Sequence, residues 1–457
     1  MAKKQRPPLV TPVVKPADPP APVPVVREEM AFELQRKLYQ AFEPVPLEAN
    51  QTDLYIDLDS VRGDSNLVTR LFQEIRFSDR NKTWLVAGHK GCGKSTELRR
   101  LYQKLNSGPE PYFTVLCAER DIDTVNVEFT DVLMAVVKRV AEELSPFNIQ
   151  LTNSYLDRLR ERLWNLIFTE IPFEKLDFTL GWVKISASMK SDPNTRESVR
   201  KVLTAETATF QQEVNNLLRQ ATEKLIREKH YAGMVVILDS LDRIFDRQQA
   251  ETLFVDRYSE MTNFACQMVL TMPISLAYQE SISQLATNYA SRPCIVPMTK
   301  LRGQPPVRAR HEPGIELFRQ IIDSRLRRIP VNRDDVFDSG AALDDVILAT
   351  GGQPTELMSC MQELIVTGPL PITRAAVADL RVKRANIFRW LVHEDWQVLR
   401  AFKDHGQFTP TDENRGILKR LLDGRALLQY LNAREWYDLN PIVEDIPVPS
   451  SAGAPAT

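Results

Sequence analysis

The stretch Gly88-His-Lys-Gly-Cys-Gly-Lys-Ser95 constrains this chain more than any other, because it lies between an apolar run and an amphipathic run. It matches G-x-x-x-x-G-K-S, the phosphate-binding loop that joins a strand to a helix. Its glycines permit tight turning, so that successive N–H groups face phosphate oxygens. The motif therefore predicts a nucleotide site formed by Gly88, His89, Lys90, Gly91, Cys92, Gly93, Lys94, Ser95 and Thr96.

A second motif supplies the acidic partner that such a loop needs. The apolar run that begins at Met234 ends in Asp239, with Asp242 three residues later. A carboxylate at the carboxyl end of a buried parallel strand lies beside the phosphate loop in this class of fold. We expect Lys94 to contact the β and γ phosphates of ATP, and Ser95 and Asp239 to hold Mg²⁺.

The composition sets limits on the partners of the chain. Its 457 residues include 58 basic and 60 acidic side chains, so the formal charge of −2 gives no general attraction to nucleic acid or to a membrane surface. No apolar run approaches the roughly 20 residues of a membrane span. The five cysteines are scattered singly and predict neither a disulfide framework nor a structural metal site. We expect a cytoplasmic protein.

The strand pattern predicts an α/β fold, a P-loop NTPase whose parallel sheet is covered by helices on both faces. Five short apolar runs read as strands, near residues 84–87, 112–117, 234–239, 264–271 and 292–299. Residues from about 145 to 230 form a helical insertion. Within it, the β-rich run from Phe178 to Ser188 predicts a hairpin or extended segment, and one long helix is expected from about Arg196 to Arg227.

Composition shifts predict further regions along the chain. They are a disordered proline-rich tail (1–27), the ATPase core (28–300), a helical lid with the turn Gly351-Gly-Gln-Pro354 (301–390), a winged-helix-like region (391–446) and a disordered tail (447–457). The winged-helix prediction rests on two helices followed by two strands. Its candidate DNA-contacting residues are Arg415, Lys419, Arg420 and Arg425, diluted by acidic neighbours. DNA contact and a protein-docking or autoinhibitory role both stay open.

Taken together, the phosphate loop, the Val-Val-Ile-Leu-Asp-Ser-Leu-Asp run and Gly-Gly-Gln-Pro resemble AAA+-like P-loop ATPases of the STAND and archaeal origin-recognition kinds. The resemblance implies Mg-ATP held between core and lid, with a winged helix that reports or restrains the nucleotide state. It also implies that Asp242 is the catalytic base and that Thr271 senses the γ-phosphate, although Thr271 reads equally well as an ordinary strand-end residue. The segment from Tyr55 to Gly63 would lie over the adenine through Arg62 and Gly63, or would simply pack.

The chain departs from this group at two points. Ser240 follows Asp239 where AAA+ enzymes carry a water-activating glutamate, and no Thr-Ser-Arg triplet ends the fourth strand. Only Arg292 and Arg243 are candidates for a transition-state arginine. Both departures favour slow turnover, which suits a molecular switch better than a motor.

Three functions follow from these motifs. The first is a slow, ATP-dependent molecular switch or regulator. The alternatives are an ATP-controlled DNA-binding regulator or loader, and a homo-oligomerising signalling or defence scaffold that docks a protein partner. ATP is preferred to GTP because the guanine-reading Asn-Lys-x-Asp tetrad is absent from the sequence.

Overall fold

The computed structural model describes residues 25–447 apart from 64–65, 119, 148, 150–153, 169–177, 279–281 and 406–410. The tails predicted for residues 1–27 and 447–457 lie almost wholly outside the described residues, so both stay predictions. None of the described helices is both long enough and apolar enough to cross a bilayer.

A five-stranded parallel sheet forms the centre of the fold, as the strand pattern predicted. Its strands are β1 (Thr83–Gly88), β2 (Phe113–Cys117), β3 (Met234–Leu238), β4 (Gln267–Thr271) and β5 (Cys294–Val296). Their order across the sheet is β2-β3-β4-β1-β5, and every neighbouring pair is parallel. Strand β4 therefore separates the strand that precedes the phosphate loop from the strand that precedes Asp239.

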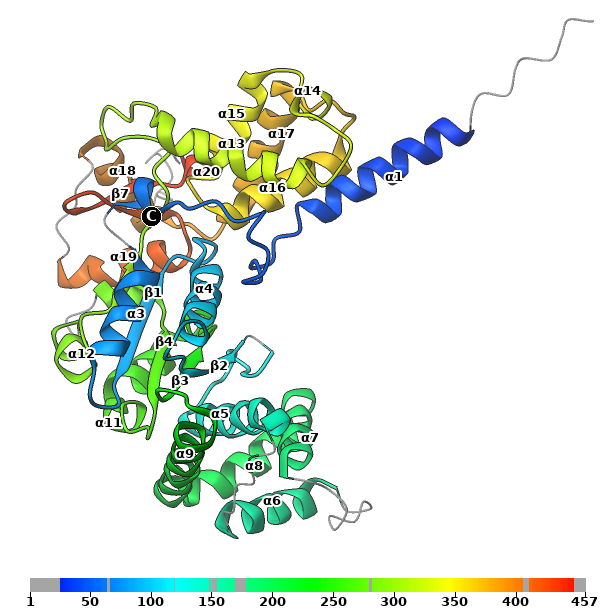
Figure 1. The fold of residues 1–457 in the computed structure, drawn as a ribbon. Coiled ribbons are helices and arrows are strands. Elements are labelled where there is room, and N and C mark those ends of the chain that lie inside the picture. The colour runs from blue at the N-terminus through cyan, green and yellow to red at the C-terminus, as the bar shows by residue number, and fades with distance from the viewer. Residues whose placement is uncertain are drawn as a thin grey trace, which may run out of the picture.

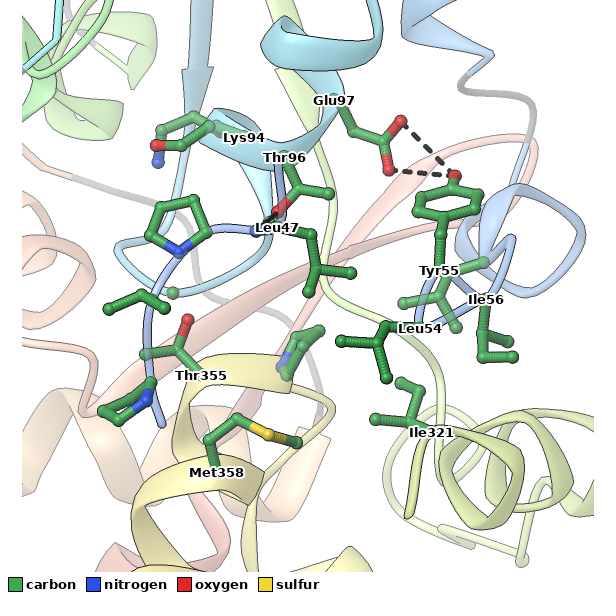
Figure 2. Close-up of a pocket in the computed structure, with 18 of the residues that line it drawn as sticks. Leu47, Leu54, Tyr55, Ile56, Lys94, Thr96, Glu97, Ile321, Thr355 and Met358 are labelled. Atoms are coloured by element: carbon green, nitrogen blue, oxygen red, sulfur yellow. Dashed lines mark hydrogen bonds between the residues drawn. The ribbon is translucent and has the colours of Figure 1, made fainter. Parts of the chain in front are cut away.

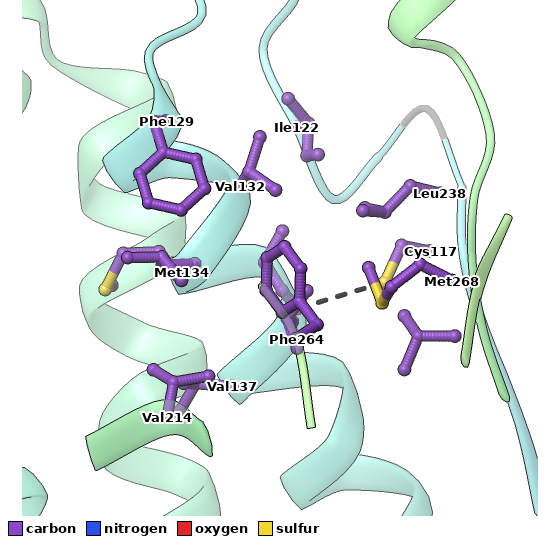
Figure 3. Close-up of a cluster of buried hydrophobic side chains, with 14 of the residues drawn as sticks. Cys117, Ile122, Phe129, Val132, Met134, Val137, Val214, Leu238, Phe264 and Met268 are labelled. Atoms are coloured by element: carbon purple, nitrogen blue, oxygen red, sulfur yellow. Dashed lines mark hydrogen bonds between the residues drawn. The ribbon is translucent and has the colours of Figure 1, made fainter. Parts of the chain in front are cut away.

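Helices cover both faces of the sheet because its strands are apolar on both sides. Along β1, Trp84 and Val86 belong to one buried cluster, whereas Leu85 and Ala87 belong to another. The first cluster is completed by α3 (Leu67–Phe77) and α4 (Lys94–Asn106), and the second by α5 (Phe129–Leu144) and α9 (Thr207–Lys229). Figure 3 shows α5 contributing Phe129, Val132 and Val137 to the second cluster.

The predicted hairpin at Phe178–Ser188 is wrong, because this stretch lies in helix α7 (Phe178–Ser191). Trp182, Ile185 and Met189 are buried, and their spacing of three and four residues is that of one helix face. The aromatic and β-branched residues of this stretch favour a strand. Packing of its buried face against α5 and α6 (Ser154–Ile167) stabilises a helix instead. The single long helix is also wrong, because Glu206 separates α8 (Pro193–Ala205) from α9.

A second group of helices packs beside the sheet domain and is joined by α1 (Val25–Ala41). Leu38 and Phe42 are buried in its core, and Figure 1 shows α1 running from this group out into solvent. Its other members are α13 (Glu312–Leu326), α14 (Arg333–Val336), α15 (Gly340–Ala349), α16 (Pro354–Thr367) and α17 (Arg374–Ala385). Shorter α-helices are α2 (Asp59–Arg62), α10 (Arg247–Glu251), α11 (Tyr258–Met261) and α12 (Ile282–Asn288).

The C-terminal unit, by which we mean the described part of residues 391–446, has the two helices and hairpin that the sequence predicted. They are α18 (His393–His405), α19 (Asp412–Asp423), the antiparallel pair β6 (Leu427–Leu431) and β7 (Glu435–Leu439), and the short α20 (Pro441–Glu444). Leu428, Tyr430 and Trp436 of the hairpin join the same buried cluster as β1, β5 and α4. The C-terminal unit is therefore packed directly onto the sheet domain.

The turn before α16 is packed tightly against the segment that follows β5. Gly352 has φ +85°, and a Cβ on it would lie 1.9 Å from the carbonyl oxygen of Thr299. Gly340, at the start of α15, has open space around the same position. Gly352 therefore has no room for a methyl group, whereas Gly340 does, so Gly340 can serve as the control for Gly352.

We expect Gly352→Ala to lower the free energy of unfolding by at least about 2 kcal/mol, because the added methyl group meets fixed backbone and the φ value is unfavourable. Gly340→Ala should change it by less than about 1 kcal/mol, toward greater stability. Urea denaturation followed by circular dichroism measures both. Equal stability of the two variants would contradict the packing of this turn.

Candidate functional site

The phosphate loop joins β1 to α4 as the motif predicted. Gly88, Gly91 and Gly93 all have positive φ, of 152°, 86° and 105°. Helix α4 begins at Lys94, immediately after this turn, so its first N–H groups and the positive end of its dipole face the loop. The backbone is thus shaped to bind an anion.

Lys94 lies at the centre of the site in a buried ion pair. Its Nζ donates to the carbonyl oxygens of Gly88 (2.7 Å) and His89 (2.9 Å), and lies 2.8 Å from the carboxylate of Asp242. The Lys94 and Asp242 side chains are only 4% and 8% exposed. Burial opposes the charge on Lys94, but the nearby negative groups, chiefly Asp242 and also Asp239, together outweigh it, and the pKa of Lys94 is raised. The loop lysine and the downstream carboxylate predicted from sequence are therefore in contact.

Asp239 lies directly after β3, where it meets the first turn of α4. Its carboxylate is hydrogen-bonded to the Ser95 hydroxyl and accepts from the backbone N–H of Ser240 at 2.8 Å. Burial, with the charge of Asp242, raises the pKa of Asp239. The two residues predicted to hold a metal ion thus lie side by side, and both offer the oxygen ligands that Mg²⁺ prefers.

Thr271 holds the backbone next to this pair. It is completely buried at the end of β4, and its hydroxyl accepts from the N–H of Asp242 (3.3 Å) and donates to the carbonyl of Leu238 (3.4 Å). Thr271 thus contacts Asp242 through the backbone N–H of Asp242. The Thr271 side chain does not line the cavity at the phosphate loop.

A cavity of about 350 Å³ opens at the phosphate loop and has two chemically different ends. One end is polar and is lined by Lys94, Ser95, Asp242 and Arg243. The other end is mostly apolar, and Figure 2 shows Leu47, Leu54, Ile56, Ile321 and Met358 around it. These residues come from the segment before α2 and from helices α13 and α16. The resemblance had placed the nucleotide between core and lid, but no sequence pattern singled out Ile321 or Met358, because their contribution depends on how the helices pack.

For the segment from Tyr55 to Gly63, packing was one of the two expected roles, and both Arg62 and Gly63 are packed against other parts of the chain. Arg62 is 2% exposed and lies against the phosphate loop, where Nη2 donates to the carbonyl of Cys92 and Nη1 lies 3.5 Å from Glu97. Gly63 packs against the backbone of Leu431, whose carbonyl oxygen would be 2.6 Å from an added Cβ. Leu54 and Ile56 line the apolar end of the cavity, and Arg62 also lines the cavity.

The remaining loop residues have separate surroundings. Lys90 is exposed, Cys92 is buried, and Thr96 accepts a hydrogen bond from the N–H of Leu47 (3.3 Å). Of the two arginines proposed from sequence, Arg243 lines the cavity and Arg292 does not. Arg325 of α13 also lines it and was missed.

His89 was predicted from the sequence to form part of the nucleotide site, but its side chain does not line the cavity. Its side chain is completely buried, with Nδ1 3.1 Å from the carbonyl oxygen of Leu422, and Nε2 accepts from the N–H of Gln429 at 2.9 Å. Because Nε2 accepts, Nδ1 carries the proton and donates, so the ring is neutral. Burial, reinforced by the charge of Lys94, lowers the pKa of His89 to about 3.

Three of the four candidate DNA-contacting residues of the C-terminal unit form ion pairs within the chain. Lys419 lies 3.9 Å from Glu251, Arg420 2.5 Å from Asp395, and Arg425 3.7 Å from Glu356. The partners of Lys419 and Arg425 lie outside the C-terminal unit. In this arrangement these basic side chains pair with carboxylates of the same chain.

No protein-family model matches the chain, and no curated protein matches its sequence. Similar solved structures include a Walker-type ATPase of Pyrococcus abyssi, with 12% identity, a TM-score of 0.45 and coverage of 88% of this chain and 98% of that chain. The ORC2 protein of Aeropyrum pernix, in ADPNP-ADP complexes, has 11% identity, a TM-score of 0.35 and coverage of 90% and 94%. The ORC1 protein of the same organism, in complex with DNA, has 13% identity, a TM-score of 0.33 and coverage of 83% and 91%. The archaeal origin-recognition group named from the motifs is thus among the matched structures.

The lowered pKa of His89 predicts a pH dependence of stability. The unfolded chain binds a proton at this histidine below about pH 6.5, whereas the folded chain does so only near pH 3, so acid favours unfolding. Between pH 7 and pH 5, His89 should lower the free energy of unfolding by about 2 kcal/mol. Urea denaturation at both pH values should give a smaller difference for His89→Gln than for the wild type.

The control is His393→Gln, which changes an exposed histidine of the C-terminal unit. It should keep the wild-type pH dependence. Part of the dependence will persist in every variant, because burial and Lys300 also lower the pKa of His311. A His89→Gln protein with the full wild-type dependence would contradict the assignment of a neutral, buried ring.

Proposed function

We propose that this protein is a P-loop ATPase that binds Mg-ATP, hydrolyses it slowly and acts as a nucleotide-dependent molecular switch. One observation supports this above all others. Lys94, Ser95 and Asp242 line the polar end of a cavity whose other end is apolar, and Asp239 is hydrogen-bonded to Ser95. A nucleoside triphosphate needs both ends, because its phosphates require polar contacts and its nucleobase gains from apolar ones.

The phosphates would bind to the N–H groups of the loop and to Lys94. In the described structure Lys94 pairs with Asp242, so binding requires the ammonium to exchange a carboxylate oxygen for a phosphate oxygen. The exchange keeps the buried lysine paired, which matters because an unpaired charge in this position would be costly. Asp242 therefore holds the place of the phosphate before the nucleotide binds.

Ser95 and Asp239 would hold the metal ion. Two observations support a Mg²⁺ ion at these residues. Ser95 and Asp239 are hydrogen-bonded to each other, and the pKa of the buried Asp239 is raised, so a cation would stabilise its carboxylate. When bound, Mg²⁺ would neutralise charge on the β- and γ-phosphate oxygens.

Asp242 is the best candidate for the base. Once Lys94 has moved to the phosphates, the carboxylate is free to accept a proton from the water that attacks the γ-phosphorus, while ADP leaves. Thr271 would position Asp242 by accepting its N–H. Slow turnover is expected because Ser240 offers no carboxylate at the position next to Asp239.

The apolar end is suited to adenine, a flat base that gains from burial against aliphatic side chains. The segment before α2 and helices α13 and α16 meet there, so the bound base would join three parts of the chain. We interpret the helices of residues 301–390 as a lid and the C-terminal unit as a winged helix. Because both contact the site, nucleotide turnover would change how they are held. The ion pairs of Lys419 and Arg425 favour this switch over direct DNA binding.

We expect Lys94→Ala to weaken ATP binding at least about 100-fold, since the phosphates lose their principal cation. Calorimetric titration with Mg-ATP measures this. Lys82→Ala, which removes an exposed lysine just before β1 that does not line the cavity, should change the dissociation constant less than about threefold. The double variant Lys94→Ala/Asp242→Asn tests whether any loss comes only from the unpaired carboxylate. Equal ATP affinity of the wild type and Lys94→Ala would overturn the proposal.

Asp242→Asn should retain ATP binding but lower phosphate release by about 100-fold or more, because the amide cannot accept the proton from water. A single-turnover assay with saturating Mg-ATP separates this chemical step from binding. Unchanged hydrolysis would remove Asp242 as the base and leave the binding assignment intact.

Ile56→Ala should raise the dissociation constant for ATP about fivefold and leave that for inorganic tripolyphosphate unchanged, because it removes roughly 1 kcal/mol of apolar contact from the base end only. Competition against a fluorescent nucleotide measures both ligands. If the two affinities fall together, the base does not lie at the apolar end.

A further inference from the structure

His89 lies in the phosphate loop, but its side chain binds the other end of the chain. Both ring nitrogens contact main-chain atoms of the C-terminal unit, Leu422 at the end of α19 and Gln429 in β6. These partners are 333 and 340 residues away in sequence. The ring is completely buried and does not line the cavity.

The main chain of the same residue contacts the catalytic lysine. The carbonyl oxygen of His89 accepts from Nζ of Lys94 at 2.9 Å, beside the bond from Lys94 to Gly88. His89 therefore contacts both the ammonium group that would bind phosphate and the backbone of the C-terminal unit.

The surroundings of this contact are rigid. Gln429 donates its N–H to His89 and accepts with its carbonyl oxygen from the N–H of Met298, just after β5, at 3.0 Å. Cys92 of the loop belongs to the same buried cluster as Tyr430 and Trp436. A shift of the loop at His89 would have to move β6 or break these bonds, because close-packed groups do not deform freely.

We propose that His89 is a positioning residue that couples phosphate occupancy of the loop to docking of the C-terminal unit. The proposal rests on the proposed function, since it requires nucleotide to bind at Lys94. When Lys94 exchanges the Asp242 carboxylate for a phosphate oxygen, its bond to the carbonyl oxygen of His89 shifts with it, and the ring of His89 transmits the change to α19 and β6. Thermodynamic linkage makes this coupling reciprocal. The factor by which bound nucleotide changes the docking equilibrium of the C-terminal unit is also the factor by which docking changes the affinity for nucleotide.

A double-mutant cycle tests this coupling. Arg308→Ala loosens the C-terminal unit far from the loop, because Arg308 pairs with the buried Asp438 at 3.0 Å and donates to the carbonyl of Lys403. His89→Leu keeps an apolar side chain of similar bulk but removes both hydrogen bonds. The dissociation constant of a fluorescent ATP analogue is measured for the wild type, both single variants and the double variant.

We expect Arg308→Ala to change the dissociation constant about fivefold when His89 is present, and less than about 1.5-fold in the His89→Leu background. His89→Gln, whose amide can donate and accept, should restore part of the coupling. His393→Leu, an exposed histidine of the same unit, should leave it unchanged. An additive cycle, or no effect of Arg308→Ala on the wild type, would overturn the proposal.

Amide hydrogen exchange of residues 427–431 provides a second readout that mere packing would not alter. Adding nucleotide should change exchange here in the wild type and His89→Gln, and should not change it in His89→Leu. If His89→Leu does not fold, the wild type and His89→Gln alone decide, because unchanged exchange in both contradicts the coupling. Failure of the proposed function would give a different result from failure of the coupling. In that case the wild type would not bind nucleotide through Lys94, and Lys94→Ala would not weaken binding.

Discussion

The rest of the structure depends on the buried ion pair between Lys94 and Asp242. Neither charge could remain buried alone, because each would lose its hydration without compensation. Their 2.8 Å contact joins the helix that follows β1 to the turn that follows β3, across the end of β4. The pair thus fixes the polar end of the cavity and keeps it ready for an anion that can take the place of the carboxylate.

The order of the sheet makes this pair possible. Parallel strands bring their carboxyl ends to one edge, and β4 separates β1 from β3 by one strand width. Thr271 fills the end of that middle strand and bonds the N–H of Asp242, while Asp239 meets Ser95. The site is therefore built on strand ends and a helix start, elements whose positions are set by the apolar clusters on both faces of the sheet.

The C-terminal unit is packed against the phosphate loop from outside the cavity. Its hairpin shares a core with β1 and β5, and its main chain supplies both partners of His89. Arg62 makes a similar connection from the other end of the chain, since it bonds the loop at Cys92 and pairs with Glu97. Segments from both ends of the sequence thus meet at one loop.

Local sequence determined the phosphate loop, the five strands, Asp239 and the C-terminal helices and hairpin, because glycine freedom and apolar periodicity act over a few residues. It failed at α7, where β-forming residues followed a helical spacing and only burial of Trp182 and Ile185 decided between them. The burial of Arg62, the ring contacts of His89 and the apolar end at Ile321 and Met358 were decided by tertiary structure alone. Their partners lie up to 340 residues away in sequence, and no short-range pattern encodes which distant backbone will be packed against a side chain.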